Sequence, residues 1–142
     1  MARYGEMDMR PLAQVPWTVS QIEFDQVAAE IKEGGACCVF VVADDIPANA
    51  RSGYAALIVA YARAQEPVLL LENGAAALLI MNGGIESAQL AAGRMIKLLT
   101  KLQLEKTLRA GVAVLQPDVD ASITAARTAA NTATPGGVAT AN

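Results

Sequence analysis

Two apolar runs on either side of Glu72–Gly74 constrain this chain more than any other feature. The stretch Leu69–Met81 reads LLLENGAAALLIM. An Asn-Gly pair between strand-like apolar segments is typical of a β-hairpin, because both residues accept the left-handed backbone of tight turns. The sequence therefore predicts paired strands at 68–71 and 76–81. Strands joined this directly must be antiparallel, which excludes a fold built only from parallel strands separated by helices.

Turn and cap signals divide the rest of the chain into further helices and strands. Ser20 and Glu23 have the spacing of a capping box at a helix start. The β-branched run at 37–43 (CCVFVVA) indicates a buried strand. The predicted elements in chain order are a helix capped by Ser20 and ended by Gly34-Gly35, a strand at 37–43, a helix at 54–64, the hairpin, a helix at 85–102, a strand at 108–115, a helix from Asp118 or Asp120 to about 134, and a short edge strand at 138–140.

The order of these elements predicts the fold class. It reads α-β-α-β-β-α-β-α, with the short last strand as an addition. A crossover on each side of a hairpin is typical of ferredoxin-like palm domains, in which a single mixed or antiparallel sheet carries helices packed on it. We therefore predict an α/β protein of the α+β type. Residues 1–16 contain two prolines and no periodicity, and we expect a flexible arm there, followed by a single domain at 17–142.

Composition excludes several classes of function. A net charge of −3 gives no electrostatic footprint for nucleic acid. The chain has no histidine, which excludes His-based zinc sites and Ser-His-Asp catalysis, and no cofactor is expected. No apolar run approaches the roughly 20 residues of a membrane span, and no signal-peptide pattern opens the sequence. Cys37 and Cys38 are expected to be core residues of a reduced cytoplasmic protein, with a redox pair as the alternative.

Four stretches carry a resemblance to a known family. They are VPWTVSQIEFDQVAAEIKEGG at 15–35, CCVFVVADD at 37–45, LRAGVAVL at 108–115 and DVDASITAARTAANTATPGG at 118–137. In this order they resemble the opening helix, the first strand, the strand after the signature hairpin and the last helix of the GGDEF domain of diguanylate cyclases. The resemblance spans Trp17 to Ala139. It implies the palm fold of that family, a role in bacterial signalling, and dimeric assembly.

The catalytic residues of that family are largely missing. ENGAA at 72–76 replaces the GGDEF signature, so Gly74 and Ala75 stand at its two acidic positions. Asp44 and Asp45 remain at the end of the first strand, either as a weak remnant of the metal site or as capping and solvated residues of a turn. The stretch from there to the tip is too short for the guanine-binding segment of cyclases. Because nucleotidyl transfer needs carboxylates that position Mg²⁺, the sequence predicts a protein that is not an enzyme.

One remnant of a ligand site is also present. Many cyclases carry an inhibitory Arg-x-x-Asp motif upstream of the signature, whose arginine contacts a phosphate of cyclic di-GMP. At the matching distance this chain reads Arg63-Ala-Gln-Glu66. Arginine is well suited to phosphate, so the resemblance implies ligand binding by Arg63 and Glu66. The competing interpretation is structural, with Arg63 in the last turn of a helix and Glu66 solvated before a proline.

These observations predict a catalytically inactive GGDEF-like domain that acts in signalling as a protein-interaction or scaffolding module, with a protein partner or as a homodimer. A mean hydropathy of +0.33 supports association. The expected contact surfaces are the apolar helix face of Tyr54, Leu57, Ile58 and Tyr61 and the hairpin tip of Glu72, Asn73 and Gly74. The alternative hypothesis is a receptor for cyclic di-GMP, or another nucleotide, through Arg63 and Glu66.

Overall fold

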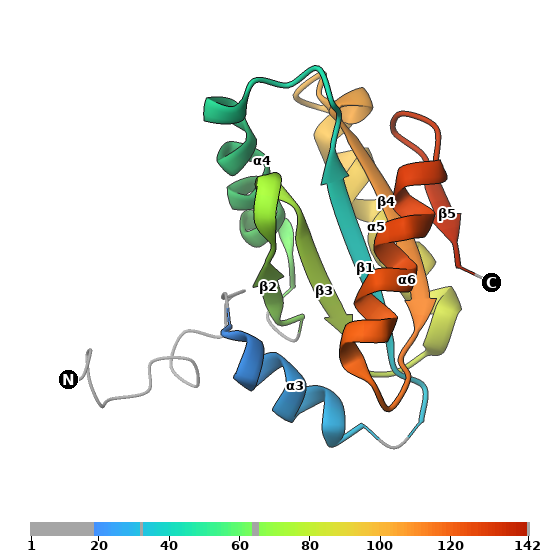
Figure 1. The fold of residues 1–142 in the computed structure, drawn as a ribbon. Coiled ribbons are helices and arrows are strands. Elements are labelled where there is room, and N and C mark those ends of the chain that lie inside the picture. The colour runs from blue at the N-terminus through green and yellow to red at the C-terminus, as the bar shows by residue number, and fades with distance from the viewer. Residues whose placement is uncertain (1–18, 32, 64–65, 142) are drawn as a thin grey trace.

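The predicted hairpin is present in the computed structural model, which describes residues 19–31, 33–63 and 66–141 (Figure 1). Its strands, β2 (Val68–Leu70) and β3 (Ala76–Ile80), pair antiparallel. A single 3-10 turn, η1 (Glu72–Gly74), joins them. Asn73 and Gly74 take the left-handed backbone there, with φ of 61° and 77°. The arm expected at residues 1–16 lies outside the described residues.

Side-chain caps begin two of the helices. The first, α3 (Gln21–Ala29), starts with the predicted capping box. The Glu23 N–H donates to Ser20 Oγ at 3.1 Å, and the Ser20 N–H donates to Glu23 Oε1 at 3.2 Å. The last helix, α6 (Val119–Thr132), is capped by Asp118, whose Oδ1 accepts from the Ala121 N–H at 3.3 Å. Of the two aspartates that the sequence left open, Asp118 is therefore the cap.

The strands form one mixed sheet in the order β2-β3-β1-β4-β5. The central strand β1 (Ala36–Val42) is antiparallel to both of its neighbours, β3 and β4 (Leu108–Val114). The short β5 (Val138–Thr140) adds parallel to β4. Two crossover helices, α4 (Ala48–Tyr61) and α5 (Gly84–Thr100), flank the hairpin in sequence, and a 3-10 turn, η2 (Glu105–Thr107), precedes β4. This is the predicted ferredoxin-like palm with one added strand.

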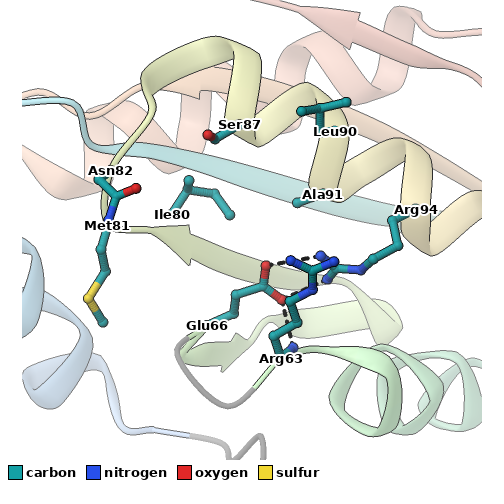
Figure 2. Close-up of a pocket in the computed structure, with 9 residues that line it drawn as sticks. All are labelled: Arg63, Glu66, Ile80, Met81, Asn82, Ser87, Leu90, Ala91 and Arg94. Carbon is teal, nitrogen blue, oxygen red and sulfur yellow. Dashed lines mark hydrogen bonds and ion pairs between the residues drawn. The ribbon is translucent and has the colours of Figure 1, made fainter.

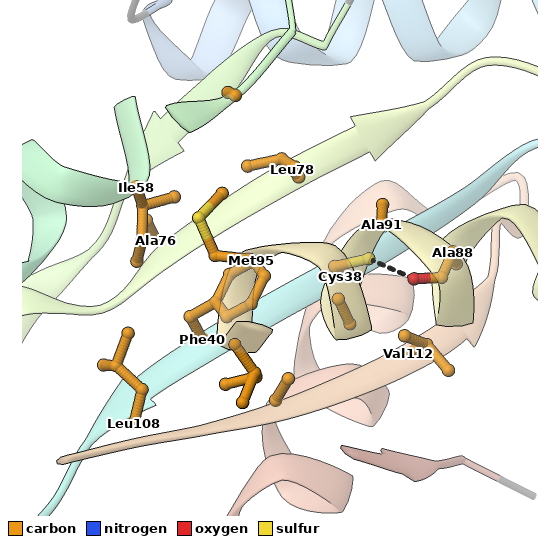
Figure 3. Packing of buried hydrophobic residues seen from close by; sticks show 14 of the residues in the cluster. Cys38, Phe40, Ile58, Ala76, Leu78, Ala88, Ala91, Met95, Leu108 and Val112 are labelled. Carbon is orange, nitrogen blue, oxygen red and sulfur yellow. Dashed lines mark hydrogen bonds between the residues drawn. The ribbon is translucent and has the colours of Figure 1, made fainter. Parts of the chain in front are cut away.

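The sheet is buried on both faces, and β1 divides its side chains between them. Cys38 and Phe40 pack with Met95 and Leu108 on the face covered by α4 and α5 (Figure 3). Cys37 faces the opposite side, which α3 and α6 cover. Both thiols are free, so the prediction that they are core residues is confirmed. Burial raises the pKa of the Cys37 thiol to about 12 and shifts the pKa of Cys38 in the same direction.

Helix α6 approaches the sheet closely because position 111 carries no side chain. A Cβ on Gly111 would collide with the carbonyl oxygen of Ala126 and would lie 2.5 Å from the amide nitrogen of Ala130. Both atoms belong to the backbone of α6, which cannot move aside as the end of a flexible side chain can. Glycine at 111 therefore sets the distance between β4 and α6.

Helix α4 starts just after Pro47, a residue suited to a first helical turn, ahead of the apolar stretch 54–64, and it ends earlier than that stretch predicts. Pro47 stands at its N-cap, and Ala62 leaves the helical conformation with a ψ of 153°. Arg63 therefore follows the helix instead of lying in its last turn. Among the described residues, no helix is long and apolar enough to cross a membrane.

Candidate functional site

The hairpin tip packs directly on the first half of α4, at the end of the sheet where β1 finishes (Figure 1). A Cβ on Gly74 would lie 2.8 Å from the carbonyl carbon of Arg51 and would collide with its oxygen. Gly74 also has a φ of +77°, which L side chains rarely adopt. Position 74 therefore has no room for a carboxylate side chain, although the resemblance to cyclases places an acidic residue there.

Arg51 fills the turn that follows β1. Its Nε donates to the Ile46 carbonyl at 3.1 Å, and one terminal nitrogen donates to the carbonyls of Asp44 and Ala43 at 3.1 and 3.3 Å. A guanidinium thus satisfies the backbone oxygens at the strand end. Nothing in the sequence pattern singled out Arg51, because its partners are main-chain atoms of a turn.

The acidic residues near the tip do not converge. Asp44 and Asp45 are exposed, and Ala75, where the resemblance to cyclases implies the second acidic residue, is buried with 2% exposure. Within the described ranges, no group of three or more His, Cys, Asp or Glu side chains is arranged to hold a metal ion.

Glu72 is the acidic residue of the tip itself, and it pairs with α6. Its Oε1 lies 3.1 Å from Arg127 Nη1. The pKa of Glu72 is lowered, first by the hydrogen bond from its own backbone N–H and then by Arg127. This ion pair links the last helix to the hairpin tip, at a position where the resemblance to cyclases implies an aspartate in place of Arg127.

A second location brings charged residues together in a pocket of about 470 Å³, between α5, the segment after α4 and the end of β3 (Figure 2). Arg63 and Glu66 come from the segment, and Arg94 comes from α5. Arg94 grips the carboxylate of Glu66 with two nitrogens, at 2.7 and 3.3 Å. The N–H of Arg63 donates to the same carboxylate at 2.7 Å. Asn82, Ser87 and Leu90 are among the other polar and apolar residues that line the pocket.

The geometry of this pocket corrects the structural interpretation of Glu66. That residue is 6% exposed, not solvated, because Arg94 and the backbone of Arg63 satisfy it. Arg63 itself is exposed. Two guanidinium groups and one carboxylate leave an excess of positive charge, and Arg94 Nε is buried without a hydrogen-bond partner in the described part of the chain.

Sequence reasoning missed Arg94, which lies 28 residues from Glu66. The signal that was present is a lone arginine in the middle of a helix that otherwise carries apolar residues toward the sheet. Only the packing of α5 beside the segment after α4 reveals its partner.

The four α4 residues expected to form a contact surface are buried or partly buried. Ile58 is completely buried and belongs to the core with Phe40 and Met95, so its assignment to a contact surface is wrong. Tyr54, Leu57 and Tyr61 are partly buried and pack against the same cluster. At the hairpin tip, Glu72 and Asn73 are exposed and Gly74 is half-buried.

The fold of this chain is similar to known structures, although its sequence matches no known family. No protein-family model and no curated protein matches the sequence. Among solved structures, the chain is similar to a structure of the isolated GGDEF domain of TpbB (also named YfiN) from Pseudomonas aeruginosa, with a TM-score of 0.65, 17% identity and 92% of each chain covered. The chain has the fold of a GGDEF domain. A 2.7 Å crystal structure of the TpbB domain agrees, with a TM-score of 0.64 and 16% identity over 87% of this chain and 96% of that one.

Within the GGDEF fold, the two locations described above have distinct positions. The hairpin tip, which the resemblance to cyclases aligns with the signature, is packed against α4. The pocket of Arg63, Glu66 and Arg94 lies at the end of β3, the second strand of that hairpin, and against α5 (Figure 2). The first location is closed by backbone contacts, whereas the second is open and carries charge.

Proposed function

We propose that this GGDEF-fold domain is catalytically inactive and acts in signalling by binding cyclic di-GMP at the pocket of Arg63 and Arg94. The observation that carries the proposal is the convergence of two guanidinium groups on one pocket of about 470 Å³. That volume falls in the usual range of small-ligand sites, roughly 300–1,000 Å³. Guanidinium groups offer planar forks of donors that match phosphate oxygens.

The closed tip supports the absence of catalysis. Phosphoryl and nucleotidyl transfer depend on positioned metal ions and carboxylates more than on covalent chemistry by the protein. Gly74 contacts the backbone of Arg51 where a carboxylate would have to stand. Ala75 is buried and has no ligand atom to offer. Asp44 and Asp45 face solvent, and among the described residues no group of three or more acidic, His or Cys side chains is arranged to hold a metal ion.

The charges of the pocket favour an anionic ligand. Arg94 is held in place by Glu66, so it keeps one orientation at little entropic cost when a ligand arrives. Arg63 is exposed and supplies the cation that a phosphate meets first. Asn82 and Ser87 add neutral hydrogen-bonding groups at the opposite wall, which suits a guanine edge.

A second candidate function is that of a protein-interaction or scaffolding module, as the sequence predicts. The observation that favours it is Leu90, which is 74% exposed on α5 at the rim of the same pocket. This side chain would offer a protein partner an apolar anchor beside the charged pocket. Under this proposal the partner is a protein or a second copy, in the cytoplasm, and the pocket need not hold a nucleotide.

Titration calorimetry with cyclic di-GMP tests the first proposal. The wild type is expected to bind, and Arg63→Ala is expected to weaken binding about ten- to a hundred-fold, since a hydrogen bond to a charged group contributes about 1.5–3 kcal/mol. Arg127→Ala is the matched control, because it removes a guanidinium from the other location. An equal loss of affinity in Arg63→Ala and Arg127→Ala would refute the assignment of the binding site to the pocket.

GTP with Mg²⁺ is the parallel test for catalysis. The proposal expects no diguanylate product by chromatography, and turnover that Asp44→Ala abolishes would contradict it. If cyclic di-GMP does not bind and light scattering finds a dimer that Leu90→Asp dissociates, the interaction module replaces the receptor.

A further inference from the structure

The outer side of α5 carries exposed residues that the fold of one copy does not use. The side of α5 toward the sheet is buried and apolar, with Met95, Ile96 and Leu99 among its residues. On a helix, positions i, i+4, i+7 and i+11 form a stripe along one side. Four exposed residues on the side away from the sheet share this spacing, and we call them the outer stripe: Glu86, Leu90, Gly93 and Lys97.

The two central residues of the outer stripe expose an apolar side chain beside bare helix backbone. Leu90 is 74% exposed. A Cβ on Gly93 would meet nothing within 4 Å, so no contact in the described part of the chain requires glycine there. Glycine inside a helix weakens the helix relative to alanine. A second helix on this side would give both residues a role, because Leu90 is an apolar contact and Gly93 lets two helix backbones come close.

The two end residues of the outer stripe carry charges of opposite sign. Glu86 lies in the first turn of α5 and Lys97 in its last turn. Their neighbours three and four positions away on the helix carry no opposite charge. Neither side chain forms an ion pair with another described residue. The stripe therefore has a negative end and a positive end, and both charges are available to a partner.

We propose that α5 of a second copy of this chain packs antiparallel on the outer stripe, across a twofold axis. Positions 86 and 97 are centred on the same point of the helix as positions 90 and 93. A twofold axis at that point places Glu86 of each copy at the level of Lys97 of the other, and it brings the two Leu90 side chains together beside Gly93. Twofold interfaces are self-complementary in this way, whereas parallel packing would place like charges on each other. The proposal rests on the second candidate function and names its partner as a second copy.

The expected dimer is weak and sensitive to salt. One helix from each copy makes the contact, which places the interface at the low end of interface sizes, so we expect a Kd of roughly 10–100 µM. The two ion pairs would lie at the rim in contact with water, so added salt should raise the Kd. Like charges at the same positions would oppose association.

Charge reversal at the outer stripe tests the proposal, with sedimentation equilibrium of the full chain up to about 500 µM as the measurement. Glu86→Lys and Lys97→Glu should each raise the Kd of the dimer about tenfold or more, because each places like charges at both ends of the contact. An equimolar mixture of the two variants should dimerise as the wild type does, since both pairs in the mixed dimer again join opposite charges. Lys106→Glu reverses an exposed charge outside α5, and this matched control should leave the Kd unchanged.

Circular dichroism establishes that each variant is folded, as expected for substitutions at exposed positions. A chain that stays monomeric at every concentration would overturn the proposal. So would a dimer that both reversals leave intact, or one that the mixture fails to restore, because each result places the contact elsewhere. If Leu90→Asp dissociates a dimer that the reversals do not weaken, the second candidate function stands and the antiparallel arrangement fails. Calorimetry with cyclic di-GMP reports on the pocket of Arg63 independently of these results.

Discussion

Replacing Gly74 with alanine tests the packing of the hairpin tip on α4. The added methyl would meet the backbone oxygen of Arg51 and would lie 2.8 Å from that residue's carbonyl carbon. The clashing atoms belong to the backbone of α4, so the hairpin tip or the helix must shift to remove the clash. We expect Gly74→Ala to destabilise the protein clearly.

Two effects set the magnitude. An L residue in the left-handed region costs about 1–2 kcal/mol, and Gly74 has a φ of +77°. Inserting a methyl group into a packed contact costs a further 1–3 kcal/mol or so. The free energy of unfolding should therefore fall by about 2–5 kcal/mol. For a chain of this size that lowers the melting temperature by roughly 10 °C.

Urea unfolding followed by circular dichroism measures the change. Gly93→Ala is the matched control, because Gly93 lies inside α5 and a Cβ there would meet nothing within 4 Å. That variant should gain about 0.5–1 kcal/mol, since alanine is the better helix former. A Gly74→Ala protein as stable as the wild type would refute the packing, and with it the argument that the tip has no room for a carboxylate.

The Arg94 ion pair, the α3 cap and the buried thiols can each be tested by substitution or by chemical modification. Arg94→Ala should lower the free energy of unfolding by about 1–3 kcal/mol, because it leaves the buried carboxylate of Glu66 without its main partner. Arg94→Lys should recover only part of that loss. Unchanged urea midpoints in both variants would contradict the ion pair. Ser20→Ala should cost about 1 kcal/mol by removing the α3 cap, with Ser52→Ala, at an exposed position within α4, as the control. The buried thiols should resist Ellman's reagent in the native state and react fully in urea. Folding raises the pKa of the Cys37 thiol from 9.0 to about 12. The stability that the neutral thiol contributes is therefore complete below pH 9 and is lost as the pH rises toward 12. A Cys37→Ala variant should lack this part of the loss of stability.

Local signals in the sequence predicted most of the fold. The Asn-Gly turn, the capping box and the β-branched run of β1 each depend on residues close together in the chain. They identified the hairpin, the start of α3 and the buried central strand. The order of the elements was then enough to specify a ferredoxin-like sheet, because few arrangements connect a hairpin with two crossover helices.

Contacts between distant residues were not predicted. Ile58 recurs with Tyr54 and Tyr61 at helical spacing, and that pattern is the same whether the helix face meets the core or a partner. The ion pair of Arg94 with Glu66 joins two elements whose separation in space depends on the packing of α5. The sequence located Arg63 and Glu66 only through the resemblance to cyclases, and it gave no sign that Glu66 already has a cationic partner.

The most direct test of the account is an NMR titration that follows the arginine Nε–H resonances as cyclic di-GMP is added. If the pocket binds cyclic di-GMP, the chemical shifts of Arg63 and Arg94 should change until the ligand saturates the site. The chemical shifts of Arg51 and Arg127 at the tip should not change. Addition of GTP and Mg²⁺ should leave Arg51 unchanged as well. Shifts at Arg51 and Arg127, or none at Arg63 and Arg94, would contradict the claim that this domain has a closed catalytic end and binds its ligand beside α5.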